Sequence, residues 1–348
     1  MTRTAGGEHE TEDADTLAVV GEVAALRRIF PRLPNASAAL VGPGDDAAVV
    51  AAPDGRYVVT TDMMIEGPDF RWAWSSPEDV GWKAAATNLA DVAAMGARPT
   101  ALVVAIAAPA ATPVAVLEQI ADGLRIACAA LAPGCGVVGG DLSVSRAFTL
   151  AVTAFGDLEG RHPVLRSGAR AGDVVAIAGT MGLAAQGLNA LFSDAVDDDG
   201  RPDAVRAAEV VARVPEVAVQ RRPMPPIAAG PVAAVAGATA MLDVSDGLAL
   251  DAARIAEASG VRIEFDSSAL GPDAAFALAG GEDHALLACF PRRRRCRRRS
   301  GRSAECSPRG WGRSTPRDLA HVESTSGRVS VDGRPYAGAA GWDPYSAG

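Results

Sequence analysis

Acidic side chains stand at the ends of short apolar segments near the start of the chain. Segments 47–52 and 57–61 are apolar or β-branched and are joined by a turn-rich connector, so they predict a β-hairpin. The oxygen-bearing side chains at one end of this hairpin are those of Asp45, Asp46, Thr60, Thr61 and Asp62. Such oxygens are the ligands that hard divalent cations prefer, and these cations commonly carry phosphates. The alternative is that the aspartates only cap turns at a polar hairpin end.

Comparable aspartates recur downstream. Asp91 lies in a predicted alanine-rich helix, on one face with Asn88, where a solvated helix face is the competing interpretation. Asp141 ends the predicted strand 136–141 directly after Gly140, and small residues there would let a ligand approach the backbone. This recurrence favours a site built from carboxylates and metal over isolated turn caps.

A later segment holds two further aspartates. Asp243 and Asp246 stand at a predicted strand end, with Ser245 between them and a helix beginning at Gly247. Asp246 could simply cap that helix, which is the usual role of an aspartate at this position, whereas Asp243 is not placed to cap it. Upstream, Arg166 lies in a turn of the connector between the two halves, where its guanidinium could meet a phosphate, although solvated linker arginines are common.

The charge balance limits the possible ligands. A net charge of −9 argues against a general nucleic-acid binder. Lys83 is the only lysine and is not part of a G-x-x-x-x-G-K-[ST] pattern, so a P-loop enzyme is excluded. Arginines concentrate between positions 292 and 317, which leaves the rest of the chain markedly acidic. We therefore expect phosphate to bind the main body only with metal ions in between.

Length and composition indicate a globular protein with two domains. The chain has 348 residues, of which 49% are hydrophobic. No apolar run reaches the length of a membrane span, and the acidic start, residues 1–15, predicts a disordered tail rather than a signal peptide or anchor. Five cysteines, an odd number without a C-x-x-C pair, predict reduced thiols in a cytoplasmic protein.

Sequence periodicity predicts the elements that must position these side chains. Besides the hairpin, helices are expected over 16–30, 76–95 and 112–131, and strands over 100–107, 136–141 and 148–155. The second helix has the strongest start signal, with Ser76 as N-cap followed by Pro77. This order predicts an α+β fold. A connector rich in Gly, Arg and Pro divides it into domains 16–160 and 161–348.

Seven motifs, in this order along the chain, resemble the thiamine-monophosphate kinase family of the aminoimidazole ribonucleotide synthetase-like superfamily. They lie at 42–46, 60–63, 88–97, 139–141, 165–168, 243–248 and 280–283. The resemblance covers about residues 17–290 and resumes near 331–334. The Asn-Leu-Ala-Asp and Leu-Arg-Ser-Gly forms favour the kinase within the superfamily.

The resemblance implies a role for each matching residue. Magnesium ions would be held against the ATP phosphates by Asp46, Thr60, Thr61, Asp62, Asp91, Asp141, Asp243 and Asp246. Those expected to be catalytic are Asp62, Asp91 and Asp246. The expected ATP contacts are Gly140, Arg166 and Ser245, and the expected substrate contacts are Asp69, Glu282 and Trp342.

The implied reaction is transfer of a phosphoryl group from ATP to thiamine monophosphate, giving ADP and thiamine diphosphate. Because both reactants are anions, positioning and charge neutralisation would carry a direct in-line transfer without a covalent nucleophile. The implied architecture is a two-domain fold whose mixed N-terminal sheet pairs in a homodimer and whose C-terminal domain is an α/β sandwich. Neither nucleic acid nor membrane is an expected partner.

Two departures from the family pattern leave alternatives open. Asp69 stands where the family usually has a substrate-contacting histidine, which puts substrate use in question. The arginine-rich segment 291–321 replaces an ordinary strand and helix; it could be a basic arm, a solvated loop or the product of a reading-frame slip. The functional alternatives are another ATP-using member of the superfamily, such as aminoimidazole ribonucleotide synthetase, and a catalytically impaired homologue.

Overall fold

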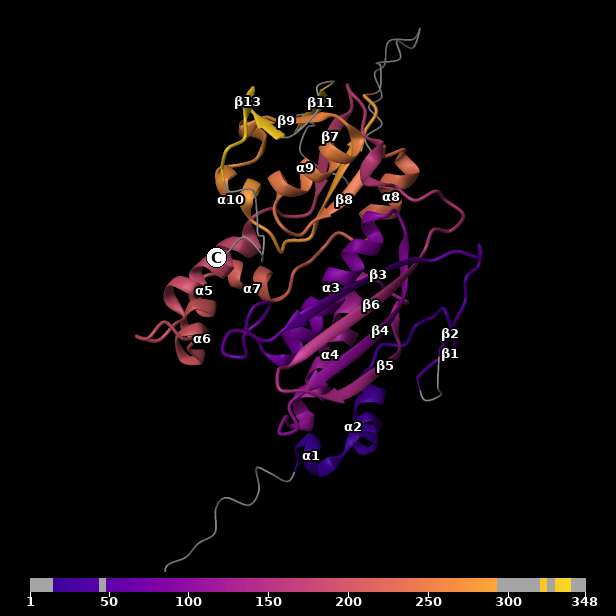
Figure 1. Cartoon of the computed structure of the whole chain (residues 1–348), viewed down its shortest axis with the longest axis vertical. Coiled ribbons are helices and arrows are strands. Elements are labelled where there is room, and N and C mark those ends of the chain that lie inside the picture. The colour runs from indigo at the N-terminus through magenta and orange to yellow at the C-terminus, as the bar shows by residue number, and fades with distance from the viewer. Residues whose placement is uncertain (1–14, 44–47, 293–319, 324–328, 339–348) are drawn as a thin grey trace, which may run out of the picture.

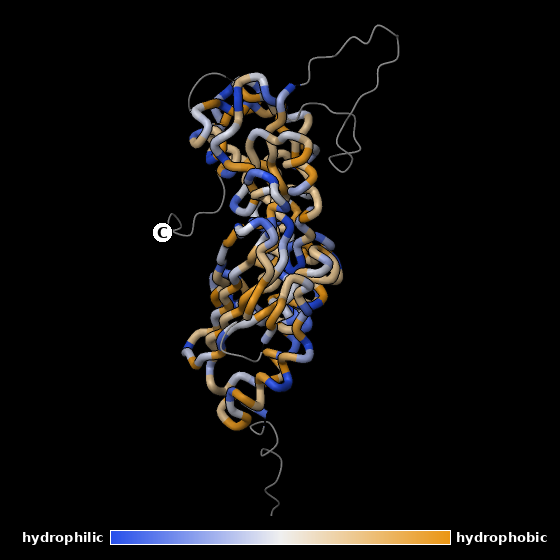
Figure 2. The backbone as a smooth tube through the Cα atoms, turned by 90° about the vertical axis from the view of Figure 1, so that its right-hand side faces the viewer, coloured by the Kyte–Doolittle hydropathy of each residue, from blue (hydrophilic) through white to orange (hydrophobic). Residues whose placement is uncertain are grey.

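The chain forms two lobes stacked along its long axis, an N-terminal lobe that ends with β6 and a C-terminal lobe that begins with β7 (Figure 1). This computed structural model describes residues 15–43, 48–292, 320–323 and 329–338. Asp46, Trp342 and most of the segment 291–321 lie outside the described residues. Figure 2 shows apolar stretches in both lobes, and a buried apolar cluster of the N-terminal lobe continues into the C-terminal lobe through Met241 and Leu286.

A four-stranded sheet in the order β3–β6–β4–β5 forms the base of the N-terminal lobe. Its strands are β3 (Val58–Ile65), β4 (Arg98–Ala108), β5 (Gly136–Val144) and β6 (Thr149–Asp157). Because β4 and β5 run parallel while the other neighbours run antiparallel, the sheet is mixed, as predicted. Helix α3 (Pro77–Ala94) packs on this sheet, and α4 (Val114–Leu131) packs on α3.

Local sequence explains how α3 begins and how it packs. Ser76 and Asp79 form a capping box, in which each side chain accepts a hydrogen bond from the backbone of the other residue. The two helices cross closely at Gly81, where an added Cβ would lie 2.1 Å from the carbonyl oxygen of Ile120. The predicted helices over 76–95 and 112–131 are confirmed by α3 and α4.

Alternation along β3 decides which side chains reach α3. Thr60 and Met64 lie on the half-buried face, which packs against the helix, and Asp62 shares that face. Val59 and Met63 point the other way and are 56% and 58% exposed. The sheet therefore presents oxygen ligands on its helix-covered face and an apolar stripe on its opposite face.

The predicted hairpin between segments 47–52 and 57–61 is wrong. The short strand β2 (Val49–Val50) pairs with β1 (Ala39–Val41) in a separate sheet. All eight residues of β3 instead pair with β6, and this pairing lets β3 bury one face on α3. Strand β5 also continues past Asp141 to Val144, so Asp141 lies inside a strand and not at its end.

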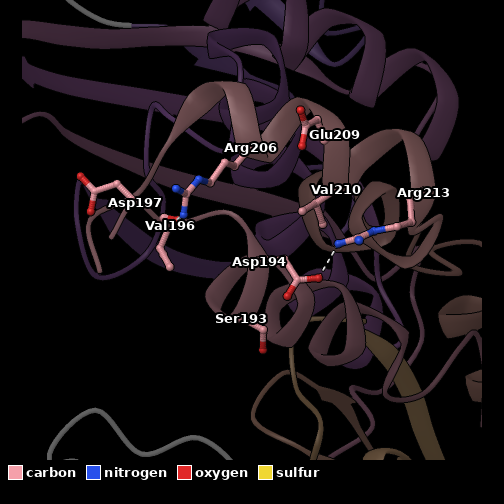
Figure 3. A pocket seen from close by; sticks show the side chains of 8 residues that line it. All are labelled: Ser193, Asp194, Val196, Asp197, Arg206, Glu209, Val210 and Arg213. Carbon is pink, nitrogen blue, oxygen red and sulfur yellow. Dashed lines mark hydrogen bonds and ion pairs between the residues drawn. The ribbon is translucent and has the colours of Figure 1, made fainter. Parts of the chain in front are cut away.

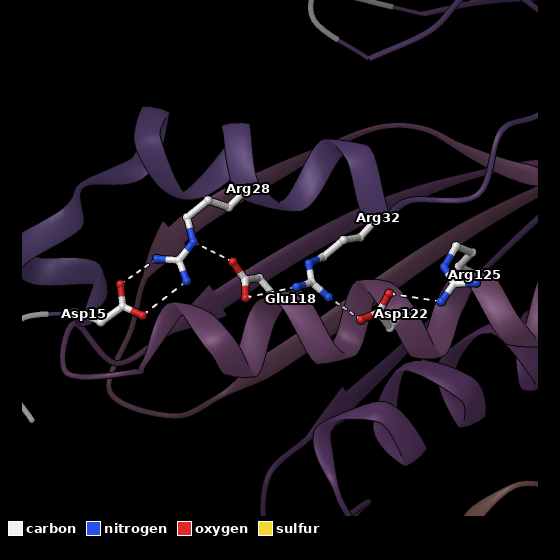
Figure 4. A network of polar contacts seen from close by, with 6 residues as sticks. All are labelled: Asp15, Arg28, Arg32, Glu118, Asp122 and Arg125. Carbon is white, nitrogen blue, oxygen red and sulfur yellow. Dashed lines mark hydrogen bonds and ion pairs between the residues drawn. The ribbon is translucent and has the colours of Figure 1, made fainter.

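The N-terminal helices are tied to α4 by ion pairs. The predicted helix over 16–30 is divided at Gly21, whose φ of +75° ends α1 (Leu17–Val20) before α2 (Glu22–Ile29), and η2 (Phe30–Arg32) follows. From these helices two arginines reach the acidic side chains of α4 in the network of Figure 4. Its members are Asp15, Arg28, Arg32, Glu118, Asp122 and Arg125.

A seven-stranded sheet in the order β13–β12–β9–β11–β7–β10–β8 forms the C-terminal lobe. Its strands are β7 (Val174–Ala178), β8 (Ala240–Val244), β9 (Arg262–Phe265), β10 (Ala285–Phe290), β11 (Ala320–Glu323), β12 (Val329–Val331) and β13 (Arg334–Pro335). The helical elements are η3 (Arg166–Gly168), α5 (Leu183–Asp194), α6 (Ala204–Arg213), α7 (Glu216–Arg221), α8 (Ala229–Ala236), α9 (Leu248–Ser259), η4 (Ser267–Ala269) and α10 (Ala274–Ala279). Strand β11 lies between β9 and β7, so the chain rejoins the sheet at residue 320, within the last two residues of the segment 291–321.

Polar contacts join the two lobes at the N-terminal end of α3. The buried carboxylate of Asp79 forms ion pairs with Arg221 and Arg222, which lie at the end of α7. The indole of Trp82 donates a 2.8 Å hydrogen bond to the carbonyl of Pro223. Among the described residues, no helix combines the length and hydropathy needed to cross a membrane.

Candidate functional site

One face of α3 carries the first half of the candidate site. Asp91 accepts a 2.8 Å hydrogen bond from the hydroxyl of Thr60 on β3. One turn earlier, the side-chain oxygen of Asn88 accepts a 3.2 Å hydrogen bond from the backbone N–H of Asp62. Because Asn88 also donates to the carbonyl of Ala84, its amide is fixed on both sides. The helix thereby holds β3 so that both carboxylates lie between β3 and α3.

The same helix reaches across to the C-terminal lobe. The ammonium of Lys83, a buried side chain, lies 2.9 Å from a carboxylate oxygen of Glu282. One turn further, the hydroxyl of Thr87 lies 3.3 Å from Nε2 of His284. The other ring nitrogen of His284 lies 3.3 Å from the carboxylate of Asp243 at the end of β8. A single helix thus connects carboxylates of both lobes.

The loop that carries Glu282 and His284 has an unusual backbone. Both residues have positive φ, +68° and +52°, a conformation that costs free energy in residues other than glycine. Between them, the buried carboxylate of Asp283 accepts hydrogen bonds from the hydroxyl of Thr180 and from two backbone N–H groups at the start of α5. The N–H of Glu282 also donates to the carbonyl of Ser245. These contacts hold the strained loop against the end of β8.

Electrostatics show that carboxylates from the two lobes lie close together. Burial and the charges of Asp243 and Asp62 raise the pKa of Asp91 to about 7, although the Thr60 hydrogen bond opposes the rise. Burial also raises the pKa of Asp62, with Asp243 and Asp246 adding to the rise and His284 opposing it. These charge effects place Asp62, Asp91, Asp243 and Asp246 near one another, and we call the four carboxylates the acidic cluster.

Two members of this acidic cluster have cationic neighbours. Arg254 on α9 lies 2.7 Å from Asp246 and 2.5 Å from Asp251. Burial raises the pKa of Asp251 to about 6, although the positive charge of Arg254 opposes the rise. Burial alone would lower the pKa of His284, but the hydrogen bond that its ring donates to Asp243 and the negative charge of that carboxylate raise it. Among the described residues, neither Asp62 nor Asp91 forms an ion pair, and the charge of His284 opposes the rise in their pKa values only in part.

The acidic cluster fits a cation that arrives with phosphates better than a closed metal cage. Within the described residues, no three Asp, Glu, His or Cys groups converge closely enough to enclose a metal ion. Magnesium is usually held by one or two carboxylates together with water and substrate phosphates. Uncompensated carboxylates such as Asp62 and Asp91 supply the hard oxygen ligands that this arrangement needs.

Several predicted site residues lie away from the acidic cluster. Thr61 points to the opposite face of β3, where it hydrogen-bonds to Val152 and Thr153. Asp141 is exposed on β5, at the other edge of the sheet, and accepts a hydrogen bond from Ser143. At Gly140 the close neighbour is protein backbone, because an added Cβ would lie 1.9 Å from the carbonyl oxygen of Val104 on β4.

Arg166 and Asp69, predicted to contact ATP and the substrate, also lie outside the acidic cluster. Arg166 is exposed in η3, and its backbone carbonyl accepts a hydrogen bond from Ser259 at the end of α9. Since Asp246 lies before the start of α9, the length of that helix separates the two residues. Asp69 is exposed and closes a turn by accepting a 2.7 Å hydrogen bond from the N–H of Ile65.

Two hollows of the described surface lie away from the acidic cluster. One, of about 640 Å³, lies between α5 and α6, and in it Arg213 pairs with Asp194 (Figure 3). Arg206, which also lines this hollow, pairs with Asp198. Another, of about 660 Å³, is mainly apolar and includes Gly140 and Asp141 in its lining. Neither is lined by Asp62, Asp91, Asp243 or Asp246.

Sequence reasoning assigned no site role to His284 or Lys83, and it placed Asn88 on one face with Asp91 without assigning it a role. His284 directly follows the motif at 280–283, and that position was the only available signal. Asn88 lies three residues before Asp91 and shares its face of α3, whereas Lys83, five residues before Asn88, lies beside that face. Their contacts depend on the packing of the two lobes, which local spacing does not predict.

Comparisons with known proteins agree with this arrangement. Residues 44–158 match the AIR synthase related protein, N-terminal domain, and residues 170–290 match the AIR synthase related protein, C-terminal domain. The fold and the acidic cluster between its lobes therefore define an AIR synthase-related protein.

The relatives of this chain indicate one family within this class of proteins. The thiamine-monophosphate kinase of Mycobacterium tuberculosis (strain CDC 1551 / Oshkosh) is 42% identical over 96% of this chain and 94% of its own. The solved thiamine monophosphate kinase of Aquifex aeolicus is 30% identical, with a TM-score of 0.65 over 84% of this chain and 91% of its own. The structure of AaThiL complexed with AMPPCP and TMP is 29% identical, with a TM-score of 0.65 over 86% of this chain and 90% of its own. The chain belongs to the thiamine-monophosphate kinase family.

Proposed function

We propose that the chain transfers the terminal phosphoryl group of ATP to thiamine monophosphate, giving ADP and thiamine diphosphate. The observation that carries the proposal is the meeting of Asp62 and Asp91 with Asp243 and Asp246 across the two lobes. The AaThiL structure with AMPPCP and TMP supports it, because a relative of the same fold is complexed with both compounds. The use of ATP fits the cytoplasmic location that the sequence predicts.

The cluster residues would position the reactants and neutralise their charge. When bound, Mg²⁺ would neutralise the phosphate oxygens between donor and acceptor. Asp62, Asp91 and Asp243 would hold this cation, with Thr60 fixing Asp91 and Asn88 fixing the backbone at Asp62. Asp246 would also bind the cation if its ion pair with Arg254 were broken. Asp46, also assigned to the metal, lies outside the described residues.

A homodimer would explain why Thr61 and Asp141 stand apart from the acidic cluster. Asp62 lies on the edge strand β3 and Gly140 on the opposite edge strand β5, with β6 and β4 between them. Three strand spacings of about 4.8 Å each therefore separate the two residues across the sheet. A second copy placed on the exposed apolar face could bring its own Asp141, and with it Gly140, toward this site. The exposed Val59 and Met63 on that face support such pairing.

The first test is ADP release that depends on thiamine monophosphate. With Mg²⁺ and ATP, the purified chain should release ADP when thiamine monophosphate is added, and thiamine diphosphate should form in equal amount. Coupled spectrophotometry would follow ADP, and chromatography would follow the product. ADP release that needs a different acceptor, such as an amide substrate, would favour another ATP-using member of the superfamily.

An Asp69→His variant tests the departure from the family pattern. Asp69 is exposed, and its side chain accepts a hydrogen bond from the N–H of Ile65 in a turn, so histidine should fit there with little loss of stability. We expect a lower KM for thiamine monophosphate, because an anion near an anionic substrate is removed, while the KM for ATP stays unchanged. A higher KM for thiamine monophosphate in this variant would show that Asp69 itself serves the substrate.

A further inference from the structure

His284 lies at the junction of the two lobes, with one partner in each. Its Nε2 lies 3.3 Å from the hydroxyl of Thr87 on α3, and its Nδ1 lies 3.3 Å from the carboxylate of Asp243 on β8. The side chain is buried, at 4% exposure. Both ring nitrogens are therefore occupied, and the plane of the imidazole is fixed by contacts at its two ends.

The partners of His284 favour a ring that donates. Because the Thr87 hydroxyl lies 3.0 Å from the carbonyl of Lys83 and can donate its one hydrogen there, it is free to accept from Nε2 of His284. A carboxylate accepts, so Nδ1 donates to Asp243. With a proton on both ring nitrogens, the imidazole is a donor between a helix of one lobe and a carboxylate of the other.

The backbone explains why a ring at this position reaches both partners. His284 has a φ of +52°, and its N–H donates a 3.1 Å hydrogen bond to the carbonyl of Val244, next to Asp243. Just before it, Asp283 is held by Thr180 and by the start of α5. A strained backbone held from both sides is typical of sites where a side chain must be aimed.

We infer that His284 is a positioning residue for Asp243: through its two hydrogen bonds it holds this carboxylate in the orientation that binds magnesium–nucleotide. The inference rests on the proposed function, because it takes Asp243 as a ligand of that complex. Groups that orient a metal-binding carboxylate tune its affinity, and their loss typically costs 10–100-fold in metal affinity or activity. His284 does not touch the reactants in this scheme.

Two matched variants test the inference. In His284→Asn the amide can take the place of Nδ1 and still donate to Asp243, whereas in His284→Gln the amide takes the place of Nε2 and reaches only Thr87. Calorimetry with Mg²⁺ and AMPPCP should show binding weakened about 10-fold or more in the Gln variant and at most about threefold in the Asn variant. Thermal unfolding of both variants measures any common loss of packing.

The outcomes separate positioning from a merely structural role. Equal loss of affinity in the Asn and Gln variants, or unchanged affinity in the Gln variant, would overturn the inference. If neither variant folds, Thr87→Val decides: binding weakened about threefold or more at an unchanged unfolding temperature supports positioning, and unchanged binding overturns it. A wild-type chain that does not bind Mg-AMPPCP would instead contradict the proposed function, and the assay of ADP release would show this independently.

Discussion

Replacing Asp91 with Asn should lower turnover by at least about 10²–10³-fold while making the ligand-free chain more stable. Asp91 accepts a hydrogen bond from Thr60, and burial together with the charges of Asp243 and Asp62 raises its pKa to about 7. The ionised carboxylate therefore opposes folding in the absence of a cation. Asparagine keeps the shape and removes the repulsion, which should add on the order of 1–2 kcal/mol to the unfolding free energy.

The same group predicts how stability depends on pH. Because the folded-state pKa of Asp91 lies above its ordinary value of 3.8, the folded chain binds this proton more tightly than the unfolded chain. The contribution to stability is complete below about pH 4 and is lost as the pH rises through about 7. Urea unfolding of ligand-free protein at several pH values should show this loss in the wild type and a smaller loss in the Asn variant.

An exposed aspartate provides the control for Asp91. Within the described part of the chain, the side chain of Asp199 pairs with the exposed Arg201 in the loop after α5, and such surface pairs contribute little. Asp199→Asn should therefore leave turnover unchanged, and the unfolding free energy should change by less than about 0.5 kcal/mol. Near-normal turnover of the Asp91→Asn variant would contradict the assigned role of Asp91.

Replacing Asp79 with Ala should destabilise the chain by about 3 kcal/mol and weaken the join between the lobes. Its buried carboxylate caps α3 together with Ser76 and forms ion pairs with Arg221 and Arg222. The substitution removes the cap and deprives both arginines of this partner. Chemical denaturation followed by tryptophan fluorescence should show the loss, because Trp82 lies at the same join.

Glu78 provides the matched control for Asp79, because it is the adjacent residue and also pairs with Arg222. Both partners of the Glu78–Arg222 pair are more than a third exposed, so Glu78→Gln should cost less than about 1 kcal/mol. Burial would raise the pKa of Asp79, but hydrogen bonds from Arg222 and Ser76 and the charge of Arg221 lower it. Its contribution to stability is therefore present above its ordinary pKa and lost as the pH falls through the lowered value. Equal effects of the two substitutions would contradict this assignment.

The sequence predicted those helices and strands that are determined by residues close together along the chain. The start of α3 follows from Ser76, Pro77 and Asp79, which form its first turn, and the structure has that helix. The hairpin prediction failed because strand pairing is decided by distant partners. β3 pairs with β6, about 90 residues later, and this pairing lets β3 bury a face on α3.

The candidate site was predicted only in part, because some of its contacts also depend on partners that are distant along the chain. Motif order identified Asp62, Asp91, Asp243 and Asp246, and the structure brings these four together. His284 could not be predicted, because its role depends on a positive φ and on partners 41 and 197 residues away. Spacing along the chain carries no information about such contacts.

The central claim is that carboxylates of both lobes jointly hold a magnesium–nucleotide complex. The most direct test is a crystal structure of the chain grown with Mg²⁺, AMPPCP and thiamine monophosphate. We expect metal density about 2.0–2.1 Å from an oxygen of Asp62 or Asp91 and from one of Asp243 or Asp246, with the nucleotide phosphates beside it. Nucleotide bound elsewhere, with these four carboxylates free of metal, would contradict the account.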